Sequence, residues 1–130
     1  MIIDAHAHMN HISYTEWLDE NGGAEGKRRA ARMRETAQRR PHATDVGQRL
    51  AQLDRNNIDF QVVTPGGGGG LPTDDTATAL TIARVINDGM ARLREESKGR
   101  LIAGGTVPLT GFKQGSSKEM TRAVKDLGLK

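Results

Sequence analysis

Short apolar runs along the chain alternate with longer stretches in which apolar residues recur at helical spacing. Residues 2–8 open with two isoleucines and then alternate polar with small residues, a pattern that predicts a β-strand. Residues 58–64 (IDFQVVT) and 101–107 (LIAGGTV) predict two more strands, and a proline follows each of them. The chain therefore offers three strands, with room for helices between and after them.

One helix is predicted before the second strand, and another between the second and third strands. The first is capped by Thr44 or Asp45 and ends in a left-handed turn at residues 56–57, while the second starts near residues 74–76 and ends at Gly99. Their apolar positions are Val46, Leu50 and Leu53 in the first helix, and Leu80, Ala83, Ile86, Met90 and Leu93 in the second. This spacing predicts helices that bury one side against a sheet.

A last helix follows the third strand. Ser116 and Glu119 have the spacing of a capping box, and Gly128 ends the helix. The stripe expected to be buried consists of Met120, Ala123, Val124 and Leu127. Strands that alternate with helices favour a parallel sheet with right-handed crossovers, so the predicted fold class is α/β.

Residues 9–43 form a polar connector that is expected to be irregular and is long for a βα loop. Its basic residues are Lys27, Arg28, Arg29, Arg32, Arg34, Arg39 and Arg40. An RNA-binding arm would interleave aromatic residues, but the aromatic residues of the whole chain are Tyr14, Trp17, Phe60 and Phe112. The favoured interpretation of the basic cluster is a solvated helix, and arginines that bind a substrate carboxylate are the functional alternative.

Composition narrows the class of protein. At 130 residues the chain has the length of one domain, and a net charge of +3 does not by itself suggest nucleic acid. The absence of cysteine fits a reducing compartment, and no apolar stretch approaches the roughly 20 residues of a membrane span. The first residues also lack the pattern of a signal peptide. We expect a cytoplasmic protein with neither a membrane nor a nucleic-acid partner.

The first strand carries the clearest candidate chemistry. Side chains alternate along a strand, so the expected faces are Ile2, Asp4, His6 and His8 on one side and Ile3, Ala5, Ala7 and Met9 on the other. His6 and His8 can direct their ring nitrogens at one metal ion, with Asp4 as acceptor of a ring N–H or of a plain structural hydrogen bond. Two ordinary histidines are the alternative. Their position at the C-terminal end of the first strand of an α/β fold favours the metal site.

Three other features have simpler interpretations. His11 extends the motif to H-x-H-x-x-H but is expected to point elsewhere if the strand ends near His8, and His42 is expected to be solvated. The glycines at residues 66–70 are not followed by the Lys and Ser/Thr of a phosphate-binding loop, so a flexible connector is expected there.

Several motifs, in their order along the chain, resemble the amidohydrolase superfamily. Residues 2–8 (IIDAHAH) resemble its opening strand, and residues 49–54 (RLAQLD) with 58–65 (IDFQVVTP) resemble the first helix and second strand of the amidohydrolase-related group. Four further motifs resemble the next units of that group: IND at 86–88, GRL at 99–101, VPL at 107–109 and RAVKDLG at 122–128. The group includes 2-amino-3-carboxymuconate 6-semialdehyde decarboxylase, γ-resorcylate decarboxylase and the 4-oxalomesaconate hydratases.

This resemblance implies the first three β/α units of a (β/α)8 TIM barrel, hence an incomplete barrel. Residues 1–130 would be the N-terminal part of one such domain, with residues 9–43 as a polar insertion. The resemblance implies one divalent ion, zinc first and manganese as the alternative, with His6 and His8 as ligands. The group's other ligands are histidines of the fifth and sixth strands and an aspartate of the eighth, whereas no histidine follows His42 here.

The functional expectation is therefore divided between the intact protein and this chain. The intact enzyme is expected to decarboxylate, hydrate or hydrolyse a small unsaturated or aromatic carboxylic acid and to form a homo-oligomer. The 130-residue chain alone is expected to be inactive. A noncatalytic truncated paralogue, acting as an oligomerising scaffold or partner subunit, is the main alternative, and a basic RNA-binding module is a third.

Overall fold

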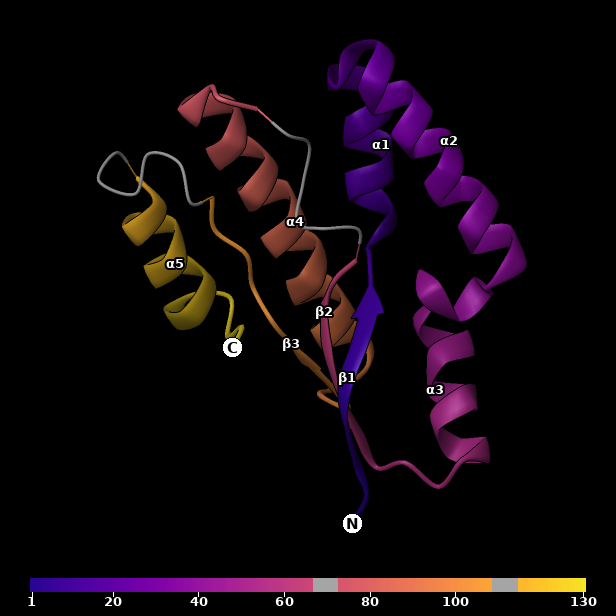
Figure 1. Cartoon of the computed structure of the whole chain (residues 1–130). Helices are drawn as coiled ribbons and strands as arrows, with labels where there is room; N and C mark the ends of the chain where they lie inside the picture. Colours follow the sequence, from indigo (N-terminus) through magenta and orange to yellow (C-terminus); the bar gives the residue numbers. More distant parts are fainter. Residues whose placement is uncertain (67–72, 109–114) are drawn as a thin grey trace.

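The computed structural model describes residues 1–66, 73–108 and 115–130 (Figure 1). The elements are β1 (Ile3–Met9), α1 (Ile12–Asn21), α2 (Gly23–Arg39), the short 3-10 helix η1 (Pro41–Ala43), α3 (Val46–Arg55), β2 (Phe60–Pro65), α4 (Thr76–Glu96), β3 (Leu101–Ala103) and α5 (Ser116–Lys125). The strands form one sheet in the order β1-β2-β3, and both pairs are parallel. The predicted α/β class with three parallel strands is confirmed.

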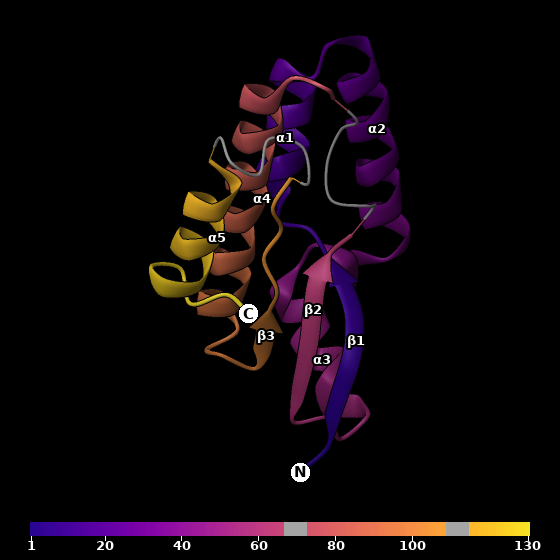
Figure 2. The same ribbon diagram turned by 60° about the vertical axis from the view of Figure 1, so that its left-hand side comes forward.

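Helices cover one face of this sheet. Helix α4 packs against β2 and β3, and it buries Ile86, Met90 and Leu93 in a core that includes Val63 and Leu101 from the strands. The opposite face carries the exposed side chains of Ile3, His6 and His8. Figure 2 shows the strands in front, with α3 behind β1 and β2.

The helix ends predicted around α3 and α4 are confirmed. Asp45 accepts a hydrogen bond from the Gln48 N–H at 2.7 Å, and Asp75 accepts one from the Thr78 N–H at 2.8 Å. Asn57 adopts the left-handed conformation after α3, with φ 54°. Local polar residues therefore fix where these two helices begin and where one ends.

The connector at residues 9–43 is not irregular as expected. It folds into α1 and α2, which pack side by side and run in opposite directions (Figure 1). The chain reverses at Gly23, where φ is +58°, and Gly26 then passes so close to α1 that an added Cβ would lie 2.5 Å from the Leu18 carbonyl oxygen. The favoured interpretation of the basic cluster as a helix is confirmed for all its members but Arg40, because the others lie on α2 and Arg40 follows its end.

The third strand is shorter than predicted. It ends at Ala103, and beyond it Asn87 of α4 binds both backbone groups of Thr106, donating to its carbonyl at 2.9 Å and accepting from its N–H at 2.8 Å. At the outer edge of β3, Lys130 donates its N–H to the Ala103 carbonyl, and Gly105 donates its N–H to the Lys130 carbonyl. This is the hydrogen-bond pattern of a parallel strand pair.

Two expectations for the last helix are wrong. Ser116 does not form a capping box: Gly115 caps α5, the Ser116 hydroxyl donates to the Pro108 carbonyl, and Glu119 turns into the interior. Met120 and Val124 are 46% and 52% exposed, because α5 packs mainly against α4 and buries its other side there.

Two other observations concern segments named above. No helix in the described ranges is both long and apolar enough to cross a membrane. Residues 67–70 of the glycine run, and Phe112, lie outside the described residues.

Candidate metal centre

An extra residue in β1 sets which side chains share a face. Pairing with β2 is regular up to Asp4 and again from Ala7, so Ala5 and His6 together lie opposite a single β2 residue. Paired residues point to the same side of a sheet. Asp4 therefore shares the helix-covered face with Ala7 and Met9, whose partners are Val63 and Pro65, and the predicted common face of Asp4 and the two histidines is wrong.

The two imidazoles do lie together. The ring centroids of His6 and His8 are 4.8 Å apart, with an angle of 82° between the ring planes, and both residues are exposed. His8 pairs with Thr64 on the face opposite Met9, which is buried against the helices. The strand thus presents both rings on the face of the sheet that the helices leave free.

Thr64 of β2 orients one of these rings. Its hydroxyl lies 3.0 Å from Nδ1 of His8. When the hydroxyl accepts the Nδ1 proton, the lone pair of Nε2 is free for a cation, which is the arrangement that metal-binding histidines use. The hydrogen bond therefore favours Nε2 as the ligand atom of His8.

Asp4 has other partners. Its carboxylate accepts a hydrogen bond from the Gln61 side chain at 2.6 Å and a longer one from the backbone N–H of His6 at 3.3 Å. These two bonds, the one from Gln61 first, lower the pKa of Asp4. Two roles were expected for Asp4, acceptor of a ring N–H or of a structural hydrogen bond. The structure shows the structural hydrogen bonds.

His11 points elsewhere, as expected. It caps α1, where its Nδ1 accepts a hydrogen bond from the Ser13 N–H at 3.1 Å and lies 2.8 Å from the Ser13 hydroxyl. Its Nε2 lies 3.8 Å from a Glu96 carboxylate oxygen on α4. His11 therefore joins the α1–α2 pair to α4 and does not extend the histidine pair.

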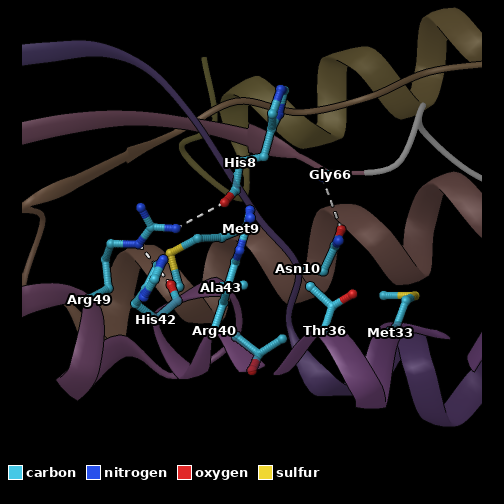
Figure 3. A pocket seen from close by; sticks show the side chains of 11 residues that line it. His8, Met9, Asn10, Met33, Thr36, Arg40, His42, Ala43, Arg49 and Gly66 are labelled. Atoms are coloured by element: carbon cyan, nitrogen blue, oxygen red, sulfur yellow. Dashed lines mark hydrogen bonds between the residues drawn. The ribbon is translucent and has the colours of Figure 1, made fainter. Parts of the chain in front are cut away.

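His42 lies in η1 and is half-buried, not simply solvated. It lines a cleft of about 410 Å³ beside the C-terminal end of β1 (Figure 3). In this view the His8 ring points away from the other side chains of the cleft. Burial, followed by the nearby charges of Arg49, Arg40 and Arg55, lowers the pKa of His42.

Arg49 of α3 holds the end of β1 in place. Its guanidinium donates to the backbone carbonyls of His8 at 3.0 Å and His42 at 2.8 Å, and the residue is only 7% exposed. Arg49 opens the motif RLAQLD at residues 49–54, and the sequence alone indicated no role for it. The structure shows that it ties the strand carrying the histidines to the residues before α3.

A buried polar cluster at the other side of the fold was also missed. Glu119 is 1% exposed and accepts hydrogen bonds from Asn87 at 2.8 Å, from Arg122 at 2.8 and 2.9 Å, and from Arg84 at 3.3 Å. Burial alone would raise the pKa of Glu119, but these hydrogen bonds outweigh it and lower the pKa. The signal available in the sequence was an acidic residue among apolar helix positions.

The histidine pair fits a divalent ion but does not complete a site. Two imidazoles on one ion, at Zn–N distances of about 2.0–2.1 Å, have ring centroids about 5 Å apart when the ligand angle is near tetrahedral, close to the separation found here. In the part of the chain that the structure describes, no group of three or more His, Cys, Asp or Glu side chains is placed to hold a metal. Two imidazoles would be two ligands of such an ion and would leave its remaining positions open.

Comparison with solved structures finds the same fold in parts of longer chains. The chain superposes on 5-carboxyvanillate decarboxylase from Sphingomonas paucimobilis with a TM-score of 0.71 and 20% identity, covering 98% of this chain and 40% of that one. A dihydroxybenzoic acid decarboxylase from a Polaromonas species, solved with manganese and the inhibitor 2-nitroresorcinol, gives a TM-score of 0.72 and 18% identity over 98% of this chain and 36% of that one. For 4-oxalomesaconate hydratase from Rhodopseudomonas palustris the values are 0.63 and 16%, over 99% of this chain and 40% of that one.

These likenesses establish the fold. The chain spans about 40% or less of the length of each of these three structures, so its architecture is that of part of their fold, as the motif resemblance predicted. No protein-family model matches the chain. A search of curated proteins by sequence also gives no match.

Proposed function

We propose that residues 1–130 are the N-terminal part of a metal-dependent enzyme of the amidohydrolase-related group, and that His6 and His8 are ligands of its divalent ion. The observation that carries this proposal is the placement of the two rings, 4.8 Å apart at the C-terminal end of β1. Parallel α/β folds bind their ligands at this end of the strands. The likeness to two decarboxylases and a hydratase supports the same assignment.

The residues around the pair would prepare it for an ion. Thr64 would hold the His8 ring through Nδ1, and Arg49 would fix the backbone beneath that ring through the His8 carbonyl. A bound divalent ion polarises a substrate or lowers the pKa of a bound water towards about 7. Both effects suit decarboxylation, hydration or hydrolysis of a small unsaturated or aromatic carboxylic acid, which is the substrate class we propose.

The choice of metal and the assembly are part of the proposal. Nitrogen ligands suit zinc, while the manganese in the Polaromonas decarboxylase supports manganese as the alternative. We propose that a complete barrel supplies the remaining ligands and that the enzyme is a homo-oligomer, with residues 9–43 as an insertion in a single barrel domain. A cytoplasmic location remains a prediction from composition.

Metal titration of the 130-residue chain tests the ligand assignment. Zinc is added to the wild type, to a His6→Ala/His8→Ala variant and to a control His11→Ala/His42→Ala variant, while the imidazole NMR signals are followed. We expect the wild type and the control to bind one ion weakly, with a Kd above about 1 μM, because two protein ligands fall short of the three of a catalytic site. The variant without His6 and His8 should not bind.

Two outcomes would contradict the proposal. Retention of stoichiometric zinc by the His6→Ala/His8→Ala variant would refute the ligands. Submicromolar zinc affinity, or turnover of a dihydroxybenzoate by the chain alone, would refute the prediction that it is incomplete and inactive.

A scaffold function is the second candidate. It is favoured by the free face of the sheet, where Ile3 is 47% exposed, and by the exposed Met120 and Val124 of α5. Light scattering separates the two proposals. A stable dimer that binds no metal would favour the scaffold.

A further inference from the structure

A groove between α1 and α4 lies apart from the strands and their histidines. It has a volume of about 310 Å³, and its described lining comes from these two helices, with no residue of β1, β2 or β3. Val85 of α4 and the half-buried Trp17 of α1 form its apolar part. The indole N–H of Trp17 donates to no described residue. The groove thus offers an aromatic surface for contact with another molecule.

The groove is acidic. Its described lining has the three carboxylates of Glu16, Glu20 and Asp88 against one cation, Arg92. Asp88 accepts a hydrogen bond from Arg122 at 2.8 Å and already has its counter-charge. Glu16 and Glu20 are exposed on α1, and neither carboxylate has a hydrogen bond or ion pair with a described residue. Two carboxylates beside the indole are therefore available to a cationic partner.

Helix α2 carries the opposite charge to α1. Helix α1 contains three acidic residues and no basic one, whereas α2 contains six basic residues against two acidic ones. One ion pair joins the two helices, from Arg34 to Asp19 at 2.7 Å. Figure 1 shows α1 between α2 and α4. For this reason α2 does not reach the groove of its own chain, and none of its residues lines that groove.

Arg32 is an exposed cation near the middle of α2. Two other arginines of the same helix are neutralised within it, because Arg28 pairs with Glu25 and Arg39 pairs with Glu35. The guanidinium of Arg32, in contrast, has no hydrogen bond or ion pair with a described residue. The chain thus presents an acidic groove with a tryptophan on one side of α1 and an available arginine on the other.

We propose that the α1–α4 groove binds α2 of a second copy of this chain, with Arg32 of that copy on Trp17 and between Glu16 and Glu20. A guanidinium stacks on an indole and pairs with carboxylates in two-pronged geometry. Tryptophan and arginine are also the residues that most often hold a protein interface together. This contact specifies the homo-oligomer proposed above. It uses neither His6 nor His8.

Self-association of the 130-residue chain is the first measurement, by sedimentation velocity over a range of protein concentrations. A chelator is present, so that a metal ion cannot bridge the histidines of two copies. We expect a reversible dimer whose affinity falls at least about tenfold between about 0.05 and 0.5 M sodium chloride, because salt screens the contact. Trp17 is the one tryptophan of the chain, so its fluorescence should change as the dimer forms.

Charge reversal locates the contact. Glu16→Lys/Glu20→Lys and Arg32→Glu should each weaken the dimer at least about tenfold, because each places like charges opposite one another. A chain that carries all three substitutions should regain an affinity within about threefold of the wild type. Recovery of this kind requires that the two surfaces meet, and a mere effect on folding would not produce it.

Matched controls change the same charge elsewhere. Asp74→Lys/Asp126→Lys and Lys125→Glu alter exposed positions outside the groove and outside α2, and should leave the dimer unchanged. Met120→Ser/Val124→Ser tests the exposed apolar surface of α5, and it should also have no effect.

Any of four results overturns the proposal. They are a chain that stays monomeric, a dimer that is insensitive to salt, failure of the triple variant to recover, and loss of the dimer in Met120→Ser/Val124→Ser. Failure of the metal proposal is a separate outcome, because zinc titration reads His6 and His8. A chain that dimerises as described and binds no zinc would refute the metal ligands alone.

Discussion

The His6–His8 pair and the cluster around Glu119 differ in exposure and in the number of their hydrogen-bond partners. The His6–His8 pair is exposed, and its one side-chain hydrogen bond to another described residue joins His8 to Thr64. The cluster around Glu119 is buried and has Asn87, Arg122 and Arg84 as partners. A buried charge is stable only when its hydrogen bonds are satisfied, so the cluster has little capacity left for a ligand. The histidine pair, in contrast, has ring nitrogens whose lone pairs can bind a ligand.

The largest effect is expected from Glu119→Ala. Removal of this carboxylate takes away the buried partner of Arg122 and one of the two acceptors of the Asn87 NH₂ group, so the free energy of unfolding should fall by about 3 kcal/mol. Denaturant unfolding measures the change, and Glu95→Ala, an exposed position on α4, is the control within about 0.5 kcal/mol. Zinc affinity at the histidine pair should not change in molecules that remain folded. A neutral effect on stability would remove the contrast between the two groups.

A smaller effect, on zinc affinity and not on stability, is expected from Thr64→Val. Valine keeps the shape but leaves Nδ1 of His8 without its partner, so zinc affinity should fall about tenfold, as it does when groups that orient metal-binding histidines are lost. Thr121→Val, on the surface of α5, should leave zinc affinity unchanged. An unchanged affinity in Thr64→Val would show that this hydrogen bond does not orient the ring.

Asp4→Asn tests whether the two faces of β1 act independently. Asparagine keeps one acceptor oxygen, for Gln61, and loses the other, which accepts the His6 N–H, so the stability should fall by about 1 kcal/mol, the usual worth of one hydrogen bond. Zinc affinity should change by no more than about threefold, because the carboxylate lies on the face opposite the imidazoles. A loss as large as that of Thr64→Val would mean that Asp4 supports the ion after all.

The smallest effect is expected from pH at His11. Burial, followed by Arg92, lowers the pKa of His11, and the opposing charges of Glu96 on α4 and Glu16 on α1 do not reverse this. The unfolded chain takes up this proton near pH 6.5 and the folded chain only at lower pH, so stability should fall as pH decreases below about 6.5. It should level off once His11 titrates in the folded chain.

His11→Asn isolates that contribution. Asparagine keeps a helix cap but does not titrate in this range, so the fall in stability between about pH 6.5 and 5 should become smaller. His42→Gln is the comparison, because the pKa of His42 is also lowered in the folded chain. Identical pH profiles of the wild type and His11→Asn would contradict the role of the His11 ring.

Sequence reasoning found the parts of the fold that are encoded locally. Asp45 and Asp75 indicate where α3 and α4 begin, because a capping side chain accepts a hydrogen bond from a backbone N–H only three residues away. The α1–α2 pair was missed because α2 buries little apolar surface, with Gly26 and Ala30 as its buried residues. The many strong helix formers in this segment were the available signal.

The errors at the candidate site have a different cause. Alternation along β1 was right for His6 and His8 and wrong for Asp4, because a bulge is defined by pairing with another strand and leaves no mark in the residues themselves. Glu119 fits a capping box by spacing. Its interior role depends on Asn87, which lies 32 residues earlier in the chain.

The bulge in β1 also bears on how the strand tolerates changes in length. Ala5 and His6 share one pairing position, so the segment contains one more residue than its ladder can use. Excision of Ala5 would leave a strand of ordinary periodicity in which Asp4 still faces the helices and both imidazoles still face away from them. Loss of a residue within the regularly paired segment Ala7–Met9 would instead exchange the two sides. Removal of Ala5 from β1, an edge strand of the described sheet, is therefore expected to keep the side chains of the strand on their present sides.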